Sequence, residues 1–380
     1  MKNWAQIARR SVVLSTVIAV ISIALSPTQL ASAAVGDTVN IPVGSVPRAL
    51  TMSPDGTKAY VANSTTNTVS VIDTAQNIVV ATINVGQVPL AVVVSPDGAT
   101  LYVANQSSGT VSVVSTSNNQ VSSTVSVGNS PLALAVASDG SKVYVANWAD
   151  DTVSVIDTSS HSVTSTINVG DGPQAMVLSS QSGILYVANG RDDTMTLINS
   201  GLNVVTQTVN TGLSNPNTLL LSSNGSLLYV LNNGANSLQV RTTSNNAVAS
   251  SIAVGSQPAG MALSPLGAYA FVSSFASSVV QKIDLSSGAI LATYSVGTNP
   301  DQLGITPSGF NVFVANYTSN SVTNITVGEA SPTVDPELAR TGLNQDVSFA
   351  LFLTAMFALL AGLLSLVHIR LYREKSISHE

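Results

Sequence analysis

The chain has 380 residues, no cysteine, 8% charged residues and a formal net charge of −6 at pH 7. The absence of cysteine excludes disulfide bonds and thiol chemistry. Sparse acidic charge without clusters of Lys or Arg argues against a nucleic-acid partner, because phosphate recognition depends on basic patches.

The N-terminal segment, residues 1–33, has the three parts of a secretory signal peptide. Basic residues as far as Arg10 precede an apolar run over residues 12–25, and Ala31-Ser32-Ala33 follows as a small-x-small cleavage site. We predict cleavage after Ala33. The alternative is an uncleaved anchor helix over the same residues.

Residues 43–300 repeat a Val-Gly-x-x-Pro phrase about every 42 residues; the fifth copy, Thr211-Gly212…Pro216, has Thr in place of Val and one additional residue before the proline. The glycines of the phrase are Gly44, Gly86, Gly128, Gly170, Gly212, Gly255 and Gly297. A fixed period of this length is typical of stacked or ringed supersecondary units.

One repeat contains four short β-branched or alternating segments, at residues 90–94, 100–104, 110–114 and 121–127, with turn-forming residues between them. Four strands in about 42 residues are typical of one blade of a β-propeller. The second segment ends in Tyr-Val-Ala-Asn, a phrase that most repeats keep.

Seven units begin at Pro47, Pro89, Pro131, Pro173, Pro216, Pro258 and Pro300. The seventh lacks a fourth strand, whereas residues 38–43 read like the fourth strand of another blade. We predict that residues 38–43 pair with residues 321–327, because closure removes the exposed edges of an open array. The expected fold is an all-β, seven-bladed β-propeller with four-stranded blades over residues 34–328.

On these two phrases the sequence resembles the YVTN family of β-propeller repeat proteins, from Val39 to Gly328. The resemblance implies a propeller fold and a place on a bacterial or archaeal cell surface. The wider relatives include lactonase-type enzymes.

Beyond a linker at residues 329–337, the segment 343–380 reads as a transmembrane helix and a basic tail. Residues 347–369 are mostly apolar and long enough to span a bilayer. Arg370, Arg373 and Lys375 follow, so we expect a cytoplasmic tail and a propeller outside the cell.

The five residues Leu338, Ala339, Arg340, Thr341 and Gly342 resemble a sortase sorting signal of the Leu-Ala-x-Thr-Gly type. The resemblance implies cleavage between Thr341 and Gly342, with sortase and the cell wall as partners. Ala339 departs from the proline of the commoner signal. The alternative is a plain single-pass membrane anchor, and either reading places the propeller on the extracellular face.

Catalytic candidates are lacking in the repeat region. Catalysis needs a base, an activated nucleophile or a metal. His161 is the one histidine of the repeats and sits in a turn, and no cluster with metal-ligand spacing accompanies it. We therefore predict no catalytic residues and leave enzymatic activity open.

Ligand-binding candidates are the places where the blades differ. Trp148, Phe275 and Tyr317 begin the loops after the second strands, and Arg191 lies in the equivalent loop of the fourth unit. Arg48 and Asp301 follow the opening prolines of neighbouring units, so we expect them at the channel mouth as an ion pair. Aromatic platforms and polar groups suit glycan or peptide ligands. The alternative is that the aromatics only cover blade edges.

Four acids form two pairs in the third and fourth units: Asp150 with Asp151, and Asp192 with Asp193. Carboxylates are ligands that Ca²⁺ prefers, so the pairs are candidates for calcium. The alternative is that they cap polar loops. No other cofactor is expected.

Together these features predict a cell-surface-anchored propeller that acts as a non-catalytic binding or display module for an extracellular glycan or protein. The alternatives are an extracellular enzyme of lactonase-like type and a self-assembling structural protein of the cell envelope.

Overall fold

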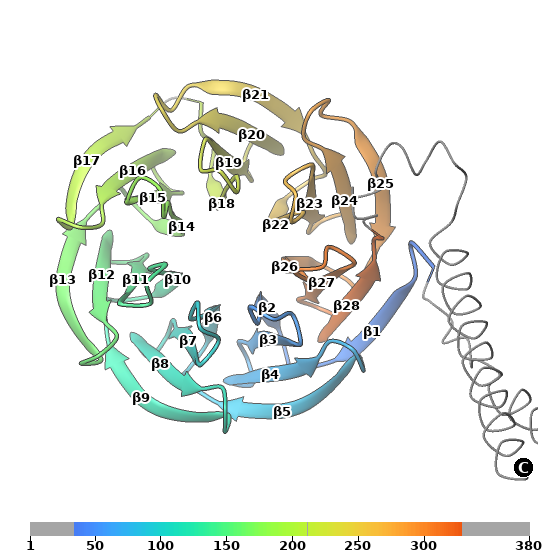
Figure 1. Cartoon of the computed structure of the whole chain (residues 1–380), viewed down its shortest axis with the longest axis horizontal. Coiled ribbons are helices and arrows are strands. Elements are labelled where there is room, and N and C mark those ends of the chain that lie inside the picture. The colour runs from blue at the N-terminus through green and yellow to red at the C-terminus, as the bar shows by residue number, and fades with distance from the viewer. Residues whose placement is uncertain (1–33, 211, 329–380) are drawn as a thin grey trace, which may run out of the picture. The chain divides into compact units, whose positions relative to one another are not determined.

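A computed structural model of the chain describes residues 34–210 and 212–328. The predicted signal peptide, linker, sorting signal and transmembrane segment lie outside these residues. Within them, twenty-eight strands form seven four-stranded antiparallel sheets arranged as blades around a common central axis (Figure 1). The described ranges contain no apolar helix long enough to cross a membrane. The predicted all-β, seven-bladed propeller is confirmed.

Each blade runs outward from the channel in chain order, except the last (Figure 1). The first strands are β2 (Pro47–Met52), β6 (Pro89–Val94), β10 (Pro131–Val136), β14 (Pro173–Leu178), β18 (Pro216–Leu221), β22 (Pro258–Leu263) and β26 (Pro300–Ile305). The second strands are β3 (Lys58–Asn63), β7 (Thr100–Asn105), β11 (Lys142–Asn147), β15 (Ile184–Asn189), β19 (Leu227–Asn232), β23 (Tyr269–Ser274) and β27 (Asn311–Asn316).

The third strands are β4 (Thr68–Asp73), β8 (Thr110–Ser115), β12 (Thr152–Asp157), β16 (Thr194–Asn199), β20 (Ser237–Thr242), β24 (Val279–Asp284) and β28 (Ser321–Thr326). The outermost strands are β5 (Ile78–Asn84), β9 (Gln120–Ser126), β13 (Ser162–Asn168), β17 (Val204–Val209), β21 (Val248–Ala253), β25 (Ile290–Ser295) and, for blade 7, β1 (Thr38–Pro42). Blades are numbered 1 to 7 from the one that begins with β2.

The N-terminal strand closes the ring, as the sequence predicts. β1 is antiparallel to β28, with Thr38 opposite Ile325 and Pro42 opposite Ser321. Ile41 is only 1% exposed and packs in a core shared by blades 7 and 1. The ends of the chain's repeat region are therefore held in a single sheet.

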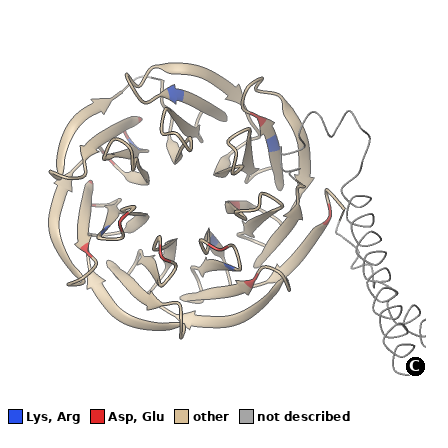
Figure 2. Cartoon of the chain, viewed as in Figure 1, with Lys and Arg blue, Asp and Glu red and all other residues tan. Residues whose placement is uncertain are grey.

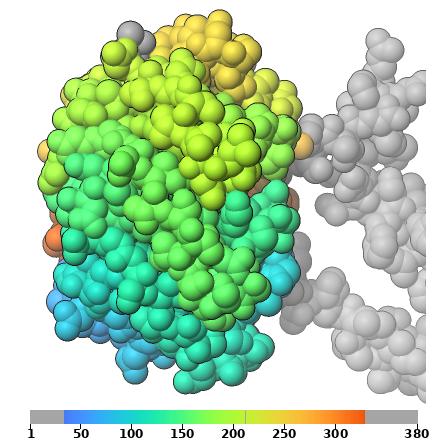
Figure 3. Space-filling view, turned by 90° about the vertical axis from the view of Figure 1, so that its left-hand side faces the viewer, coloured from blue at the N-terminus to red at the C-terminus, as the bar shows by residue number. Residues whose placement is uncertain are grey.

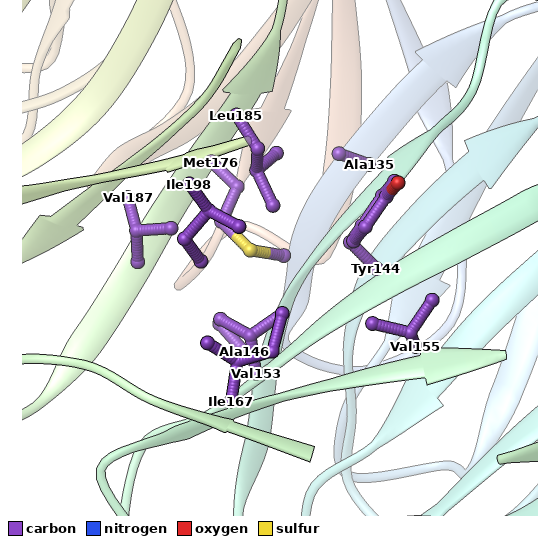
Figure 4. Packing of buried hydrophobic residues seen from close by; sticks show 10 residues of the cluster. All are labelled: Ala135, Tyr144, Ala146, Val153, Val155, Ile167, Met176, Leu185, Val187 and Ile198. Carbon is purple, nitrogen blue, oxygen red and sulfur yellow. The ribbon is translucent and has the colours of Figure 1, made fainter. Parts of the chain in front are cut away.

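The hydrophobic core lies between blades rather than within them. Figure 4 shows one such core, in which Tyr144 and Val155 of blade 3 meet Met176 and Leu185 of blade 4. Six further clusters repeat this arrangement around the described ring. Every blade thus depends on both of its neighbours.

The second strand of each blade is buried on both faces, which explains the Tyr-Val-Ala-Asn phrase. In blade 1, Tyr60 packs against blade 2, whereas Ala59 and Val61 pack against blade 7. Alternate residues of a strand point to opposite faces of a sheet. A strand between two neighbouring blades therefore carries a continuous apolar run instead of an alternating one.

The repeated glycine and the repeated asparagine are in contact with each other. Asn105 Nδ2 donates hydrogen bonds to Thr110 Oγ1 at 3.1 Å and to Ser112 Oγ at 2.9 Å. A Cβ atom on Gly86 would lie 2.6 Å from Asn105 Cγ, far inside contact distance. The same contact occurs at Gly44, Gly128, Gly170 and Gly297. In these five repeats the two phrases recur together because the glycine makes room for an asparagine side chain.

The outermost strands carry no Lys, Arg, Asp or Glu (Figure 2). They expose apolar side chains instead, including Ile78 at 49% and Leu291 at 53%. Seen from the side, the atoms of successive blades form a continuous rim (Figure 3). An edge without charge has little protection against pairing with another strand.

Replacing Ile41 by Ala is expected to lower the free energy of unfolding of the whole ring by about 2–5 kcal/mol, because it leaves a cavity between blades 7 and 1. Val39 on the same strand is 44% exposed, so Val39→Ala is the matched control. Urea denaturation followed by circular dichroism measures both. Equal effects of the two substitutions would contradict closure of the ring by a buried β1.

Replacing Gly86 by Ala is expected to cost about 1–3 kcal/mol, because the added methyl group has to displace Asn105 in a packed interior. Gly201→Ala is the control, since the nearest atom to its Cβ would be Asn199 Oδ1 at an ordinary 3.4 Å. Thermal unfolding compares the two variants. If both melt with the wild type, contact with asparagine is not the reason for the repeated glycine.

Candidate functional site

The start of each first strand turns one side chain toward the channel. The residue before each opening proline has a positive φ, from 44° at Asn215 to 66° at Gly172. The strand pairing then skips the residue after the proline: in blade 1, Pro47 pairs with Asn63 and Ala49 with Ala62, so the residue between them has no partner. Such a bulge re-aims a side chain out of the ladder.

The residues that follow the prolines converge on one pocket with a volume of about 330 Å³. They are Arg48, Leu90, Leu132, Gln174, Asn217, Ala259 and Asp301. Their place at the channel mouth is as the sequence predicts. Because the same position of seven nearly equal blades carries a cation, two leucines, two amides, an alanine and an acid, the pocket has a distinct character on each side.

Four further residues line this pocket: Asn233, Gln257, Phe275 and Gln302. Only Phe275 is among the residues that the sequence singles out. Asn233 occupies the same first place of its loop as Phe275, and Gln257 directly precedes an opening proline, so alignment of the repeats offered a signal for both. Gln302 is the second residue after its proline, and no repeat pattern marks it.

The reason for the position of Gln302 is a wider bulge. In blade 7 the pairing skips from Pro300 to Leu303, two residues instead of one. Gly260 of blade 6 allows this, since a Cβ there would lie 2.8 Å from the Cα of Gln302. A glycine in one blade and a polar residue in the next thus act together.

The predicted ion pair is present, with Arg48 Nη1 3.1 Å from Asp301 Oδ2. The side chain of Asp301 is 14% exposed and that of Arg48 is 38% exposed. Burial raises the pKa of Asp301 to about 6, and the charge and hydrogen bond of Arg48 lower it only in part. The pair therefore joins blades 7 and 1 at the pocket with little net charge above pH 6.

Two of the predicted aromatics lie beside this pair. The guanidinium carbon of Arg48 is 5.0 Å from the centre of the Tyr317 ring. The Phe275 and Tyr317 rings meet edge to face, with centres 5.8 Å apart. The structure therefore brings four sequence-predicted residues together: Arg48, Asp301, Phe275 and Tyr317.

Trp148 and Arg191 form a separate pair and are not among the residues that line the pocket. The guanidinium carbon of Arg191 lies 3.6 Å from the centre of the Trp148 ring, and Arg191 Nη1 is 3.2 Å from Asp171 Oδ1. One face of the indole is thus covered by a cation from the next blade. Any ligand that these two residues bind would lie outside the pocket, and their ligand-binding role stays a prediction.

The paired acids connect neighbouring blades. Asp150 accepts hydrogen bonds from Asn129 N at 2.7 Å and Asn129 Nδ2 at 2.9 Å. Asp151 accepts one from Gly172 N at 2.9 Å. Asp150 thus holds the loop that enters its own blade from blade 2, and Asp151 holds the loop that leads on to blade 4.

Asp192 and Asp193 repeat this arrangement one blade further, accepting from Asp171 N at 3.0 Å and Asn215 N at 2.6 Å. Asn67 and Asn236 do the same at the equivalent place of blades 1 and 5. Residues 34–210 and 212–328 contain no group of three or more His, Cys, Asp or Glu side chains that could hold a metal ion. The acids of the third and fourth blades thus have a structural use that needs no calcium.

Fold and comparisons agree on the class of protein: the chain is a seven-bladed β-propeller. It matches the model of the YNCE-like β-propeller family over residues 122–303 and that of the lactonase seven-bladed β-propeller family over residues 49–125. Its structure is similar to a chain of Kuenenia stuttgartiensis hydrazine synthase, with a TM-score of 0.68 and 22% identity, covering 79% of this chain and 98% of that one. At this identity the likeness is one of fold. Among curated proteins there is no match.

The carboxyl group of Asp301 is expected to make folding pH-dependent. Its pKa of about 6 in the folded protein lies above the ordinary value of 3.8, so the folded state binds the proton more tightly. Stability from this group is present below about pH 4 and is lost as the pH rises through 6. Urea midpoints between pH 4 and 7 should therefore fall with rising pH, and less steeply in Asp301→Asn.

Asp284→Asn is the control for this experiment. The hydroxyl and backbone N–H groups of Ser286 and Ser287 lower the pKa of Asp284 to about 2, outside the window measured. A pH profile that Asp301→Asn and Asp284→Asn alter equally would contradict the assignment.

Proposed function

We propose that this protein is a non-catalytic binding module, displayed on the extracellular face of the cell, that holds the end of a neutral glycan in the pocket at the channel mouth. The observation that carries the proposal is that seven equivalent places converge on one pocket and carry charged, apolar and amide side chains there. If these seven positions had only a structural role in equal blades, their side chains would not need to differ. Recognition of a ligand that carries several kinds of chemical group requires different side chains around the pocket.

The chemistry of the pocket favours a glycan. Leu90, Leu132 and Phe275 offer apolar contact for the C–H face of a sugar ring, and the amides of Gln174 and Asn217 offer hydrogen bonds. A volume of about 330 Å³ is at the small end of natural ligand sites and suits one or two sugar units. Because Arg48 and Asp301 neutralise each other, an uncharged ligand is favoured.

Display outside the cell is proposed from the ends of the sequence. A signal peptide at residues 1–33 would direct export, and sortase would then join Thr341 to the cell wall. Anchoring by residues 347–369 alone would leave the pocket on the same side of the membrane. Membership of the YVTN family is part of this proposal, since such proteins recur on cell surfaces.

A lactonase-like activity is the weaker candidate, although one family match is to lactonases. Of the residues that line the pocket, only Arg48 and Asp301 are ionisable, and they are held in a pair. His161, the one histidine of the described residues, lies in the turn between β12 and β13 and not in the pocket. The pocket therefore offers binding groups but no unengaged base.

Self-assembly is supported by a different observation, the uncharged outermost strands with their exposed apolar residues. Edge-to-edge pairing of such strands would join copies side by side and leave the pocket open. Sedimentation at micromolar concentration without ligand would detect it. Self-assembly through the outermost strands would leave the pocket accessible, so it is compatible with glycan binding.

Filling the pocket is expected to abolish binding. Leu132→Trp places a large ring among the lining residues, so the affinity for a short glycan should fall at least about tenfold. Leu266→Trp is the control, since Leu266 lies in the turn between β22 and β23 and is 62% exposed. Calorimetric titration with a panel of neutral disaccharides measures both variants and the wild type. No binding by the wild type, or equal binding by Leu132→Trp, would overturn the proposed function.

A further inference from the structure

Four amide side chains at the pocket share one arrangement. Gln174, Asn217, Asn233 and Gln302 all line it, and all use their NH₂ groups on backbone carbonyls at the starts of first strands. These strands, β18 and β22, lie next to each other around the channel (Figure 1). The amides thereby cap carbonyl groups of neighbouring strands.

The hydrogen bonds have ordinary lengths. Gln174 Nε2 is 3.0 Å from Pro216 O and 2.7 Å from Asn215 Oδ1. Pro258 O accepts from Asn217 Nδ2 at 2.8 Å and from Asn233 Nδ2 at 3.0 Å. Gln302 Nε2 is 3.2 Å from Ala259 O.

These contacts fix which way each amide points. A carbonyl oxygen accepts hydrogen bonds and cannot donate, so the nitrogen and not the oxygen of each amide must face it. The amide oxygens of Gln174, Asn233 and Gln302 receive no hydrogen bond from any described residue, and Asn217 Oδ1 is buried without a partner. The amide oxygens of Gln174, Asn233 and Gln302 are not buried, so they can accept from a donor outside the protein, whereas Asn217 Oδ1 has almost no accessible surface.

The pocket thus has an acceptor side, formed by the amide oxygens of Gln174, Asn233 and Gln302. The one cationic donor of the lining, Arg48, is engaged by Asp301. We propose that the acceptor side selects ligands by their uncharged hydrogen-bond donors, hydroxyl or amide N–H groups, and rejects the same skeleton when those donors are blocked as ethers. This inference concerns the specificity of the pocket in the proposed function and rests on that pocket being the binding site.

An ether oxygen can only accept a hydrogen bond, as can the amide oxygen of the protein that it would face. No hydrogen bond forms between them, and the amide oxygen stays unpaired. Sites built to hydrogen-bond a ligand hydroxyl discriminate strongly against an analogue that lacks it. We expect an affinity loss of about tenfold or more for each donor that is blocked.

The test uses two small probes on the full-length protein: glycerol and its tri-O-methyl ether. They share a carbon skeleton and differ in donors. Binding is followed by the NMR shifts of the Leu90 and Leu132 methyl groups. We expect saturable shifts with glycerol and none with the ether at equal concentration. Equal effects of the two probes, or no effect of either, would overturn the inference.

Two substitutions with residues that other blades tolerate locate the effect. Asn233→Ser introduces the residue that blade 1 has at the equivalent position, Ser64, and Gln302→Ala introduces the equivalent residue Ala49. If one variant fails to fold, the other still tests the inference. Both should reduce the preference for glycerol. Gln181→Ala is the matched control, because Gln181 Nε2 also donates to a backbone carbonyl of the next blade, Ser223 O at 3.3 Å, but away from the pocket. A preference that survives both pocket substitutions would contradict the assignment.

The two proposals can fail separately. If neutral disaccharides do not bind but glycerol is preferred over its ether, the glycan assignment is wrong and the donor selectivity stands. If disaccharides bind but their deoxyfluoro analogues, which accept and cannot donate, bind equally well at every position, the donor selectivity is wrong and the glycan assignment stands.

Discussion

Packing between blades is the interaction on which the rest of this structure depends. A four-stranded blade has no core of its own, because its apolar side chains meet those of the blades before and after it. Burial of apolar surface is the dominant favourable term in folding, so a blade without both neighbours would lose much of its stability. The ring therefore has to close, and β1 closes it by completing the sheet of the last blade.

This constraint separates the residues that must repeat from those that are free to vary. The strands repeat because each one fits between two equivalent neighbours, and the glycine that admits the side chain of Asn105 shows how narrow that fit is. The loops repeat only in their connections to the next blade, where Asn67 and Asp151 serve equally as acceptors. Chemical variety is therefore concentrated at the strand starts, which face the channel and are not packed between blades.

The pocket combines these two effects. Its position follows from a bulge that every blade shares, whereas its chemistry follows from the different kinds of side chain that the blades carry at that bulge. An ion pair joins blade 7 to blade 1, and the leucines of blades 2 and 3 form the apolar side of the pocket. The capping amides of Gln174 and Asn217 lie in blades 4 and 5. The capping bonds give the amides a structural role, and the same bonds turn the oxygens of Gln174, Asn233 and Gln302 into the groups that remain for a ligand.

The amino-acid sequence alone sufficed for the number of blades, the strands within each, the closing strand and the channel-facing residues, because a period of about 42 residues records repeated packing in one dimension. It also suggested that Arg48 and Asp301 meet, since they follow equivalent prolines in blades that closure makes adjacent. It did not show that Phe275 lines the pocket whereas Trp148 does not. Nor did it reveal that the paired acids accept hydrogen bonds from backbone N–H groups. Those features depend on the side-chain directions of two blades at once, and the entry of Gln302 into the pocket depends on a glycine in the neighbouring blade. Only the assembled ring determines such contacts between blades.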